Sequence, residues 1–140
     1  STEFIVFARK FENHTHKFNS DLLKQINDGK RFSEVWRMNS IEKWEKNCGK
    51  HKTQKPINLL ARIILASTNK GDTILDPFSG SASTGIAANL LGRKYIGIEK
   101  EKDFLNLSIN RREELENLEV FNNYRNKIKD YRKLKQFNVF

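Results

Sequence analysis

Residues 76–85, Asp-Pro-Phe-Ser-Gly-Ser-Ala-Ser-Thr-Gly, form a run of small and polar side chains between a β-rich segment and a helical one. Small residues let a backbone approach a ligand closely, and the N-terminus of the following helix favours negative groups. Glu99 ends the next β-rich segment, about 20 positions after Asp76, the usual spacing of an acidic residue that binds ribose hydroxyls. These residues predict a site for a nucleoside-containing cofactor. The alternative is an ordinary strand–helix–strand unit with a surface glutamate.

The same loop argues against two common nucleotide ligands. The phosphate-binding pattern Gly-x-x-x-x-Gly-Lys-(Ser/Thr) and the three-glycine dinucleotide fingerprint are both missing from the sequence. A carboxylate at Asp76 would repel a pyrophosphate and attract a cation. S-adenosylmethionine carries an ammonium and a sulfonium, and it is therefore the cofactor that the loop favours.

Hydrophobic periodicity places the loop within an alternation of helices and strands. From residue 56 onward the pattern predicts a helix to about 69, a buried strand 73–75, a helix 84–91, a strand 95–99 and a helix 103–118. Such alternation predicts an α/β fold with parallel strands and right-handed crossovers. Before residue 56, the pattern predicts a strand at 3–8, a short helix near 21–27 and a short strand at 35–38.

Composition narrows the class of protein. The 140 residues carry a formal charge of +9, which favours a polyanionic partner, with nucleic acid first. Cys48 is the single cysteine, so neither a disulfide framework nor a metal-binding cysteine cluster is expected. The single cysteine fits a reducing, cytoplasmic setting. No apolar run is long enough to cross a membrane, and the N-terminus does not read as a secretory signal.

Two motifs then resemble those of a known family, the amino-methylating DNA methyltransferases, which methylate adenine N6 or cytosine N4. Asp-Pro-Phe-Ser-Gly-Ser at 76–81 is similar to their cofactor loop, and His-Lys-Thr-Gln-Lys-Pro at 51–56 is similar to an element before it. Tyr-Ile-Gly-Ile-Glu at 95–99 also matches, and the resemblance extends from residue 3 to about 118. The order of the motifs resembles the β-type permutation, in which the catalytic motif lies in the N-terminal half.

The resemblance implies a partial Rossmann-like methyltransferase fold that binds S-adenosylmethionine. It places Thr53, Gln54 and Lys55 at the methionine end of the cofactor, and Glu99 at the ribose. The implied cofactor-binding residues are Thr53, Gln54, Lys55, Asp76, Phe78, Ser79, Gly80, Ser81, Ser83 and Glu99. His51 is expected to order the Thr53 loop rather than to act as a base.

Two positions of the loop depart from the family. The family usually has Gly at Ala82 and Thr at Ser83. If position 82 needs a positive φ, alanine costs roughly 1 kcal/mol there. We then expect a weaker cofactor affinity but not the loss of the site.

The family's catalytic motif, (Asp/Asn/Ser)-Pro-Pro-(Tyr/Trp/Phe), is not in this sequence. It holds the flipped base and its amino group. The chain has two prolines, Pro56 and Pro77, and they are not adjacent. We therefore predict no catalytic residue, and no metal site, in the chain itself. It is expected to be half of a split enzyme, a truncated product or a fragment.

The resemblance and the charge together give the expected organisation and partners. Residues 1–118 would form a partial methyltransferase domain, with a long polar loop region at 9–50 and a cofactor-binding core at 51–118. Residues 119–140 would form a basic, helical tail. The expected partners are double-stranded DNA and a second chain with the catalytic motif, in a restriction–modification setting; a homo-oligomer stays open. Adenine N6 is the favoured target. The alternatives are a degenerate module that binds DNA or a partner without catalysis, and part of an RNA methyltransferase.

Overall fold

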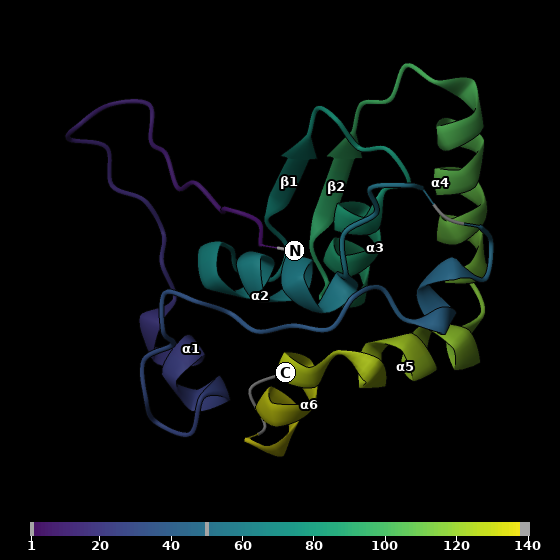
Figure 1. Cartoon of the computed structure of the whole chain (residues 1–140). Helices are drawn as coiled ribbons and strands as arrows, with labels where there is room; N and C mark the ends of the chain where they lie inside the picture. The colour runs from purple at the N-terminus through teal and green to yellow at the C-terminus, as the bar shows by residue number, and fades with distance from the viewer. Residues whose placement is uncertain (1, 50, 138–140) are drawn as a thin grey trace.

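A computed structural model describes residues 2–49 and 51–137, and it shows helices packed beside and against one face of a small parallel sheet (Figure 1). Residues 1, 50 and 138–140 lie outside the described residues. The first two belong to the predicted methyltransferase domain, and the last three belong to the predicted basic tail. The elements are, in chain order, α1 (Ser20–Ile26), the 3₁₀ helix η1 (Lys43–Lys46), α2 (Ile57–Ser67), β1 (Thr73–Asp76), α3 (Ser83–Leu90), β2 (Lys94–Gly97), α4 (Lys102–Glu114), α5 (Leu118–Lys127) and α6 (Lys129–Gln136). None of the described helices has the length and apolar character needed to cross a bilayer.

The segment from α2 to β2 confirms the predicted alternation of helices and strands. Strands β1 and β2 pair in parallel, with Leu75 opposite Ile96, and α3 connects them. Helix α2 starts directly after Pro56, whose fixed φ suits a helix start. Helix α3 is rich in alanine and packs against α2 and both strands, so it forms the centre of the core.

One face of the sheet is open, which corrects the prediction of a buried strand. Ile74 and Tyr95 point toward the core cluster, whereas Leu75 is 61% exposed and Ile96 is 55% exposed. Side chains alternate across a strand, and within the described residues α3 packs on the strands while Ile74 and Tyr95 face the core cluster. The apolar run predicted the strand correctly but could not show that only one of its faces is covered.

The predicted helix 103–118 is in fact two helices. Helix α4 ends at Glu114, and the side chain of Asn117 then accepts hydrogen bonds from the backbone N–H of Glu119 (2.9 Å) and Val120 (3.2 Å). Asparagine is a favoured N-cap because its side chain satisfies these free N–H groups. The cap starts a second helix, α5, which packs against α3.

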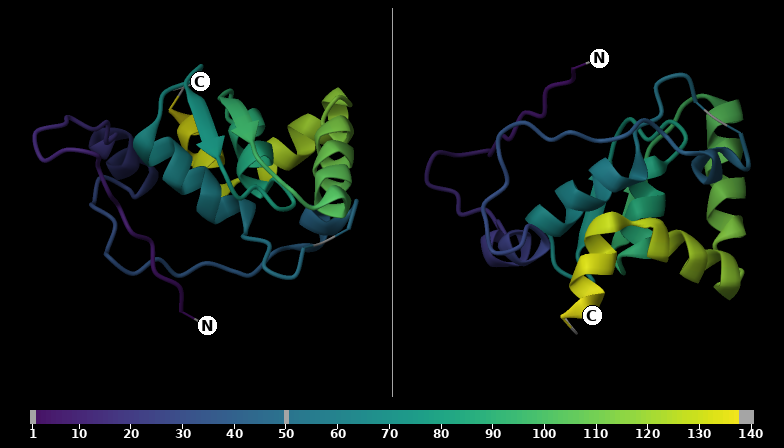
Figure 2. Two further views of the ribbon diagram at one scale, coloured as in Figure 1. Left: turned by 90° about the horizontal axis from the view of Figure 1, so that it is seen from above. Right: turned by 60° about the horizontal axis from the view of Figure 1, so that its bottom comes forward.

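Helices α5 and α6 lie beside α2 and α3 (Figure 2), and they contribute side chains to the hydrophobic core. Tyr124, Ile128, Tyr131 and Leu134 are buried in the same cluster as the residues of α2 and α3. Both helices lie within the segment for which the sequence predicts a helical tail, as far as residue 136. Core contacts cross the predicted boundary at 118/119, while that division itself stays a prediction.

The region before α2 is largely irregular. Helix α1 confirms the predicted helix, and it packs Leu23 and Ile26 against the core. The predicted strands at 3–8 and 35–38 are wrong: both segments are irregular, and Phe4 is 91% exposed (purple trace in Figure 1). A strand needs a hydrogen-bonded neighbour, and in the described residues β1 and β2 pair only with each other.

Candidate functional site

The loop at 77–82 leaves the carboxyl end of β1 and enters α3, where ligands bind in open α/β sheets. Three backbone N–H groups fix its path. Phe78 N–H donates to Asp76 Oδ1 (3.1 Å), Ser79 N–H donates to the Ile98 carbonyl (3.0 Å), and Ala82 N–H donates to the Ser79 carbonyl (2.7 Å). The loop is thus tied both to its own strand and to the end of β2.

Glu99 joins this loop from the end of β2. Its Oε2 accepts the Gly80 N–H (2.8 Å) and its Oε1 accepts the Glu101 N–H (2.9 Å). The Glu101 N–H, followed by the Gly80 N–H, lowers the pKa of the Glu99 carboxyl from its ordinary value. Each oxygen of a carboxylate has more than one acceptor site, so Glu99 could still accept hydrogen bonds from a pair of hydroxyls.

Ala82 has the left-handed conformation, with φ 54° and ψ 36°. Position 82, where the family usually has glycine, therefore does have a positive φ. A side chain with a Cβ is disfavoured there by roughly 1–2 kcal/mol. Alanine at this position therefore stores strain at the entrance to α3.

The loop at 51–56 lies against the 77–82 loop. His51 Nδ1 accepts the Thr53 N–H (3.2 Å), so His51 orders the Thr53 loop as expected. Gln54 Oε1 accepts a hydrogen bond from Ser81 Oγ (3.4 Å), and Gln54 Nε2 donates to the Glu45 carbonyl (2.9 Å). Gln54 therefore connects the two loops that the sequence motifs singled out.

Two of the predicted residues point elsewhere. Lys55 Nζ donates to Glu3 Oε1 (2.8 Å), in a partly exposed ion pair with the N-terminal segment. The ring of Phe78 is 90% exposed. Thr53 is linked to the 77–82 loop only indirectly, through His51 and Gln54. The remaining predicted residues lie in the loop or directly beside it: Gln54, Asp76, Ser79, Gly80, Ser81, Ser83 and Glu99.

Sequence reasoning gave no role to Arg111, which the structure places under the loop. The residue is 5% exposed, and Nη1 donates to the Ser81 carbonyl (2.5 Å), Ser81 Oγ (3.1 Å) and Ser83 Oγ (3.0 Å). Burial lowers the pKa of the Arg111 guanidinium. Arg111 and Arg112 are adjacent in one polar helix, and only packing decides which of them is buried.

Tyr95 fills the space between β2 and α3 beneath the loop. A Cβ added at Gly85 would lie 2.5 Å from the Tyr95 ring, and one at Gly97 would lie 2.6 Å from the Tyr95 hydroxyl. Burial first, and the charge of Asp76 second, raise the pKa of Tyr95 to about 12. Tyr95 is therefore a neutral phenol that supports the floor of the site.

The described residues contain no group of three or more His, Cys, Asp or Glu side chains that could hold a metal ion. The two histidines of the polar region have other contacts. His14 Nδ1 lies 2.9 Å from the Thr15 carbonyl, and the His16 ring packs on Phe7 at 4.7 Å between centroids. The polar groups that the loop and its neighbours offer include carboxylates, backbone amides and hydroxyls.

A parallel α/β unit with a small-residue loop after one strand and a carboxylate after the next defines a nucleoside-cofactor-binding protein. The pattern of the N6/N4 DNA methylase family matches residues 1–110. The chain belongs to this family.

The chain is also similar in sequence to individual type II methyltransferases. The chain is 55% identical over 115 residues to the type II methyltransferase M2.MboI of Moraxella bovis. The matched segment covers 82% of this chain and 42% of that protein. The chain is 53% identical over 114 residues to M2.DpnII of Streptococcus pneumoniae, covering 81% of this chain and 42% of that protein. The chain thus spans less than half the length of these curated relatives.

A solved structure supports the fold. The crystal structure of the M1.HpyAVI–SAM complex matches with a TM-score of 0.55 and 35% identity, covering 71% of this chain and 45% of that chain. The predicted fold class, a partial Rossmann-like methyltransferase fold with parallel strands and flanking helices, is confirmed.

Proposed function

We propose that this chain is the S-adenosylmethionine-binding part of a site-specific DNA methyltransferase that methylates an exocyclic amino group, with adenine N6 favoured. The observation that carries the proposal is the contact between the loop after β1 and Glu99 after β2, through the Gly80 N–H. Membership of the N6/N4 DNA methylase family and the similarity to type II methyltransferases support it.

The side chains at the site fit this cofactor. The loop and its neighbours offer the carboxylates of Asp76 and Glu99, and residues 77–82 contain neither lysine nor arginine. Such a set suits a cationic ligand with a ribose and disfavours a polyphosphate. When bound, S-adenosylmethionine supplies an electrophilic methyl group on its sulfonium.

Each predicted residue has a role in the proposal. Glu99 accepts the ribose hydroxyls, and Asp76 stabilises the positive charge of the methionine end. Thr53, Gln54 and Lys55 line that end, for which Lys55 must leave its partner Glu3. The remaining binding residues are Phe78, Ser79, Gly80 and Ser81 in the loop and Ser83 at the start of α3.

Methyl transfer needs a further part in this proposal. The base-binding motif (Asp/Asn/Ser)-Pro-Pro-(Tyr/Trp/Phe) is not among the 140 residues, and the curated relatives are more than twice as long as the matched segment. A polypeptide with that motif would complete the enzyme. Double-stranded DNA, attracted by the charge of +9, would be the substrate.

Calorimetric titration with S-adenosylmethionine tests the cofactor site. We expect micromolar binding, weakened at least tenfold in Glu99→Ala and in Asp76→Ala. Glu113→Ala, an exposed position on α4, is the matched control and should bind as the wild type does. The absence of binding by the folded wild-type chain would leave a degenerate module that binds DNA or a partner as the better description.

A second assay tests the need for the complement. Transfer of a labelled methyl group to duplex DNA should be undetectable with the chain alone. It should appear on addition of a polypeptide that carries the base-binding motif of the same family. Transfer by the chain alone would contradict this part of the proposal.

A further inference from the structure

Arg111 is a buried charge whose hydrogen-bond partners in the loop region are serine oxygens rather than carboxylates. One nitrogen, Nη1, lies within 3.1 Å of the Ser81 carbonyl, Ser81 Oγ and Ser83 Oγ. Burying a charge is costly unless hydrogen bonds compensate for the lost water. The contacts to both sides of residue 82 therefore fix the loop and the guanidinium with respect to each other.

The position of these contacts matters because Ala82 lies between them. The Ser81 carbonyl belongs to the peptide that enters Ala82, and Ser83 is the first residue of α3. Ala82 has a φ of 54°, a conformation that persists in a residue with a Cβ only where its surroundings impose it. The hydrogen bonds of Arg111 hold the peptide before Ala82 and the side chain after it, so they span the strained residue.

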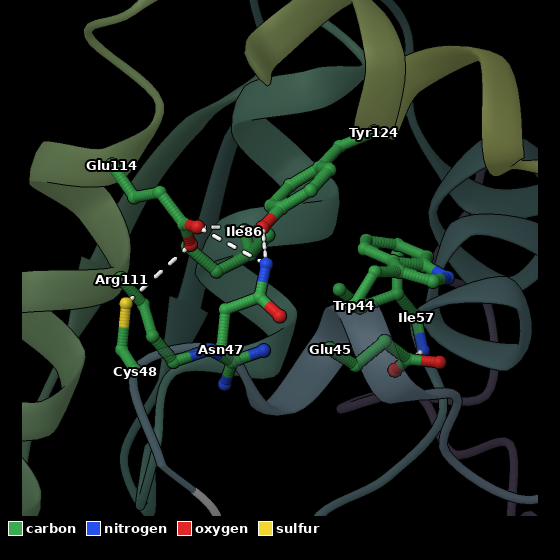
Figure 3. Close-up of a pocket in the computed structure, with 9 residues that line it drawn as sticks. All are labelled: Trp44, Glu45, Asn47, Cys48, Ile57, Ile86, Arg111, Glu114 and Tyr124. Atoms are coloured by element: carbon green, nitrogen blue, oxygen red, sulfur yellow. Dashed lines mark hydrogen bonds between the residues drawn. The ribbon is translucent and has the colours of Figure 1, made fainter.

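Polar side chains behind Arg111 hold its helix in place (Figure 3). Glu114, one turn later in α4, accepts hydrogen bonds from the Tyr124 hydroxyl (2.6 Å) and from Asn47 Nδ2 (3.3 Å). The charges of Glu45 and Glu114 favour the charged form of Arg111. Tyr124 lies in α5 and, like Arg111 and Glu114, it lies beyond residues 1–110, which match the family pattern.

We propose that Arg111 is a positioning residue for the 77–82 loop, which it holds ready for the cofactor by keeping Ala82 in the left-handed conformation. This inference rests on the proposed function, because the value of a preformed loop lies in binding S-adenosylmethionine. Without Arg111, the loop would relax to a negative φ at Ala82. Binding would then have to restore the strained conformation.

The test is a double-mutant cycle between positions 111 and 82, measured by calorimetric titration with S-adenosylmethionine. Arg111→Lys keeps the charge but loses the planar guanidinium, and we expect binding about tenfold weaker. In the Ala82→Gly background the same change should cost only about twofold, since glycine adopts a positive φ without strain. Arg112→Lys, at the exposed neighbouring position, is the control and should leave the affinity unchanged.

A purely structural role predicts a different pattern. Arg111→Lys would then lower the melting temperature, leave the affinity of the folded protein unchanged and gain nothing from Ala82→Gly, and that result would overturn the proposal. An equal loss of affinity in both backgrounds would also overturn it. If Arg111→Lys fails to fold, Ser83→Ala removes one acceptor of Arg111 and should show the same dependence on residue 82 with a smaller effect.

Hydrogen exchange without cofactor separates this inference from the proposed function. The Gly80 and Ala82 N–H groups are hydrogen-bonded in the wild type and should exchange several-fold faster in Arg111→Lys. If exchange is faster in Arg111→Lys but the wild-type chain binds no S-adenosylmethionine, the positioning role is kept and the proposed function is rejected. Unchanged exchange would reject the positioning role.

Discussion

The backbone N–H of Gly80 donates to Glu99 Oε2 over 2.8 Å, and this bond joins the loop after β1 to the residue that follows β2. The two residues lie on opposite sides of the α3 crossover. The parallel pairing of β1 with β2 brings the carboxyl ends of both strands to one edge. This contact places a carboxylate beside a loop of small residues.

The lowered pKa of Glu99 predicts how cofactor affinity depends on pH. The pKa of the Glu99 carboxyl is lowered in the folded protein, so Glu99 is ionised at every pH above the ordinary pKa of a glutamate. Its contribution to cofactor binding is lost only as the pH falls through the lowered pKa. The ratio of dissociation constants between Glu99→Gln and wild type should therefore stay constant from pH 8 to about pH 5. Titrations with S-adenosylmethionine at each pH give this ratio, in which contributions from other groups cancel. A ratio that already collapses near pH 6 would contradict the prediction.

Replacement of Ala82 by glycine should stabilise the protein. Glycine removes the strain of a φ of 54°, but it also gains entropy in the unfolded chain, so we expect a net gain of about 0.5–1 kcal/mol. Urea unfolding measures the free energy. Ala87→Gly, in the middle of α3, is the matched control and should lose at least about 1 kcal/mol. A loss of stability in Ala82→Gly would show that the backbone at residue 82 is not strained.

The packing of Tyr95 predicts a pair of coupled substitutions. Gly85→Ala places a Cβ 2.5 Å from the Tyr95 ring, and overpacking of this kind costs about 1–3 kcal/mol. In a Tyr95→Ala background the same change should cost nothing or stabilise α3, since alanine favours helices. Thermal or urea unfolding of the four proteins gives the coupling energy. Additive effects would mean that Tyr95 is not the obstacle.

The ion pair between α2 and α6 should contribute more than the exposed pair nearby. Arg62 Nε donates to Asp130 Oδ2 (2.8 Å) and Arg62 Nη2 donates to Asp130 Oδ1 (2.9 Å), and both side chains are largely buried. Asp130→Ala leaves the guanidinium without its partner and should cost about 3 kcal/mol. The pair of Lys133 with Asp28 is exposed, and Lys133→Ala should cost less than about 1 kcal/mol. Equal losses in urea unfolding would contradict this ranking.

Several elements followed from the sequence because their signals are local. Pro56 marks the start of α2, and the alternation of apolar segments with turn residues predicted β1, α3 and β2. The end of α4 was missed because the cap at Asn117 starts a second helix within a pattern that continues past it. The false strand at 3–8 shows the limit of propensity, since pairing partners cannot be identified from the segment itself.

The candidate site also contains residues that local motifs reveal and residues that only packing brings there. The motifs around Thr53, Asp76 and Glu99 were visible because they are short stretches with a distinctive order. Arg111 was not visible as a loop contact, because it lies 30 residues from Ser81 in the sequence. The sequence showed alanine where the family usually has glycine, but only the fold shows that Ala82 has a positive φ.

The sequence by itself determined the two loops, the helices and strands that carry them, and the absence of adjacent prolines. These features depend on neighbouring residues and on residue identity alone. Only the tertiary structure decided that Gln54 and Arg111 meet at Ser81, that one face of the sheet is open, and that Ala82 is strained. Burial and backbone strain arise when segments distant in the chain pack together, and no local pattern specifies which side chains will then meet.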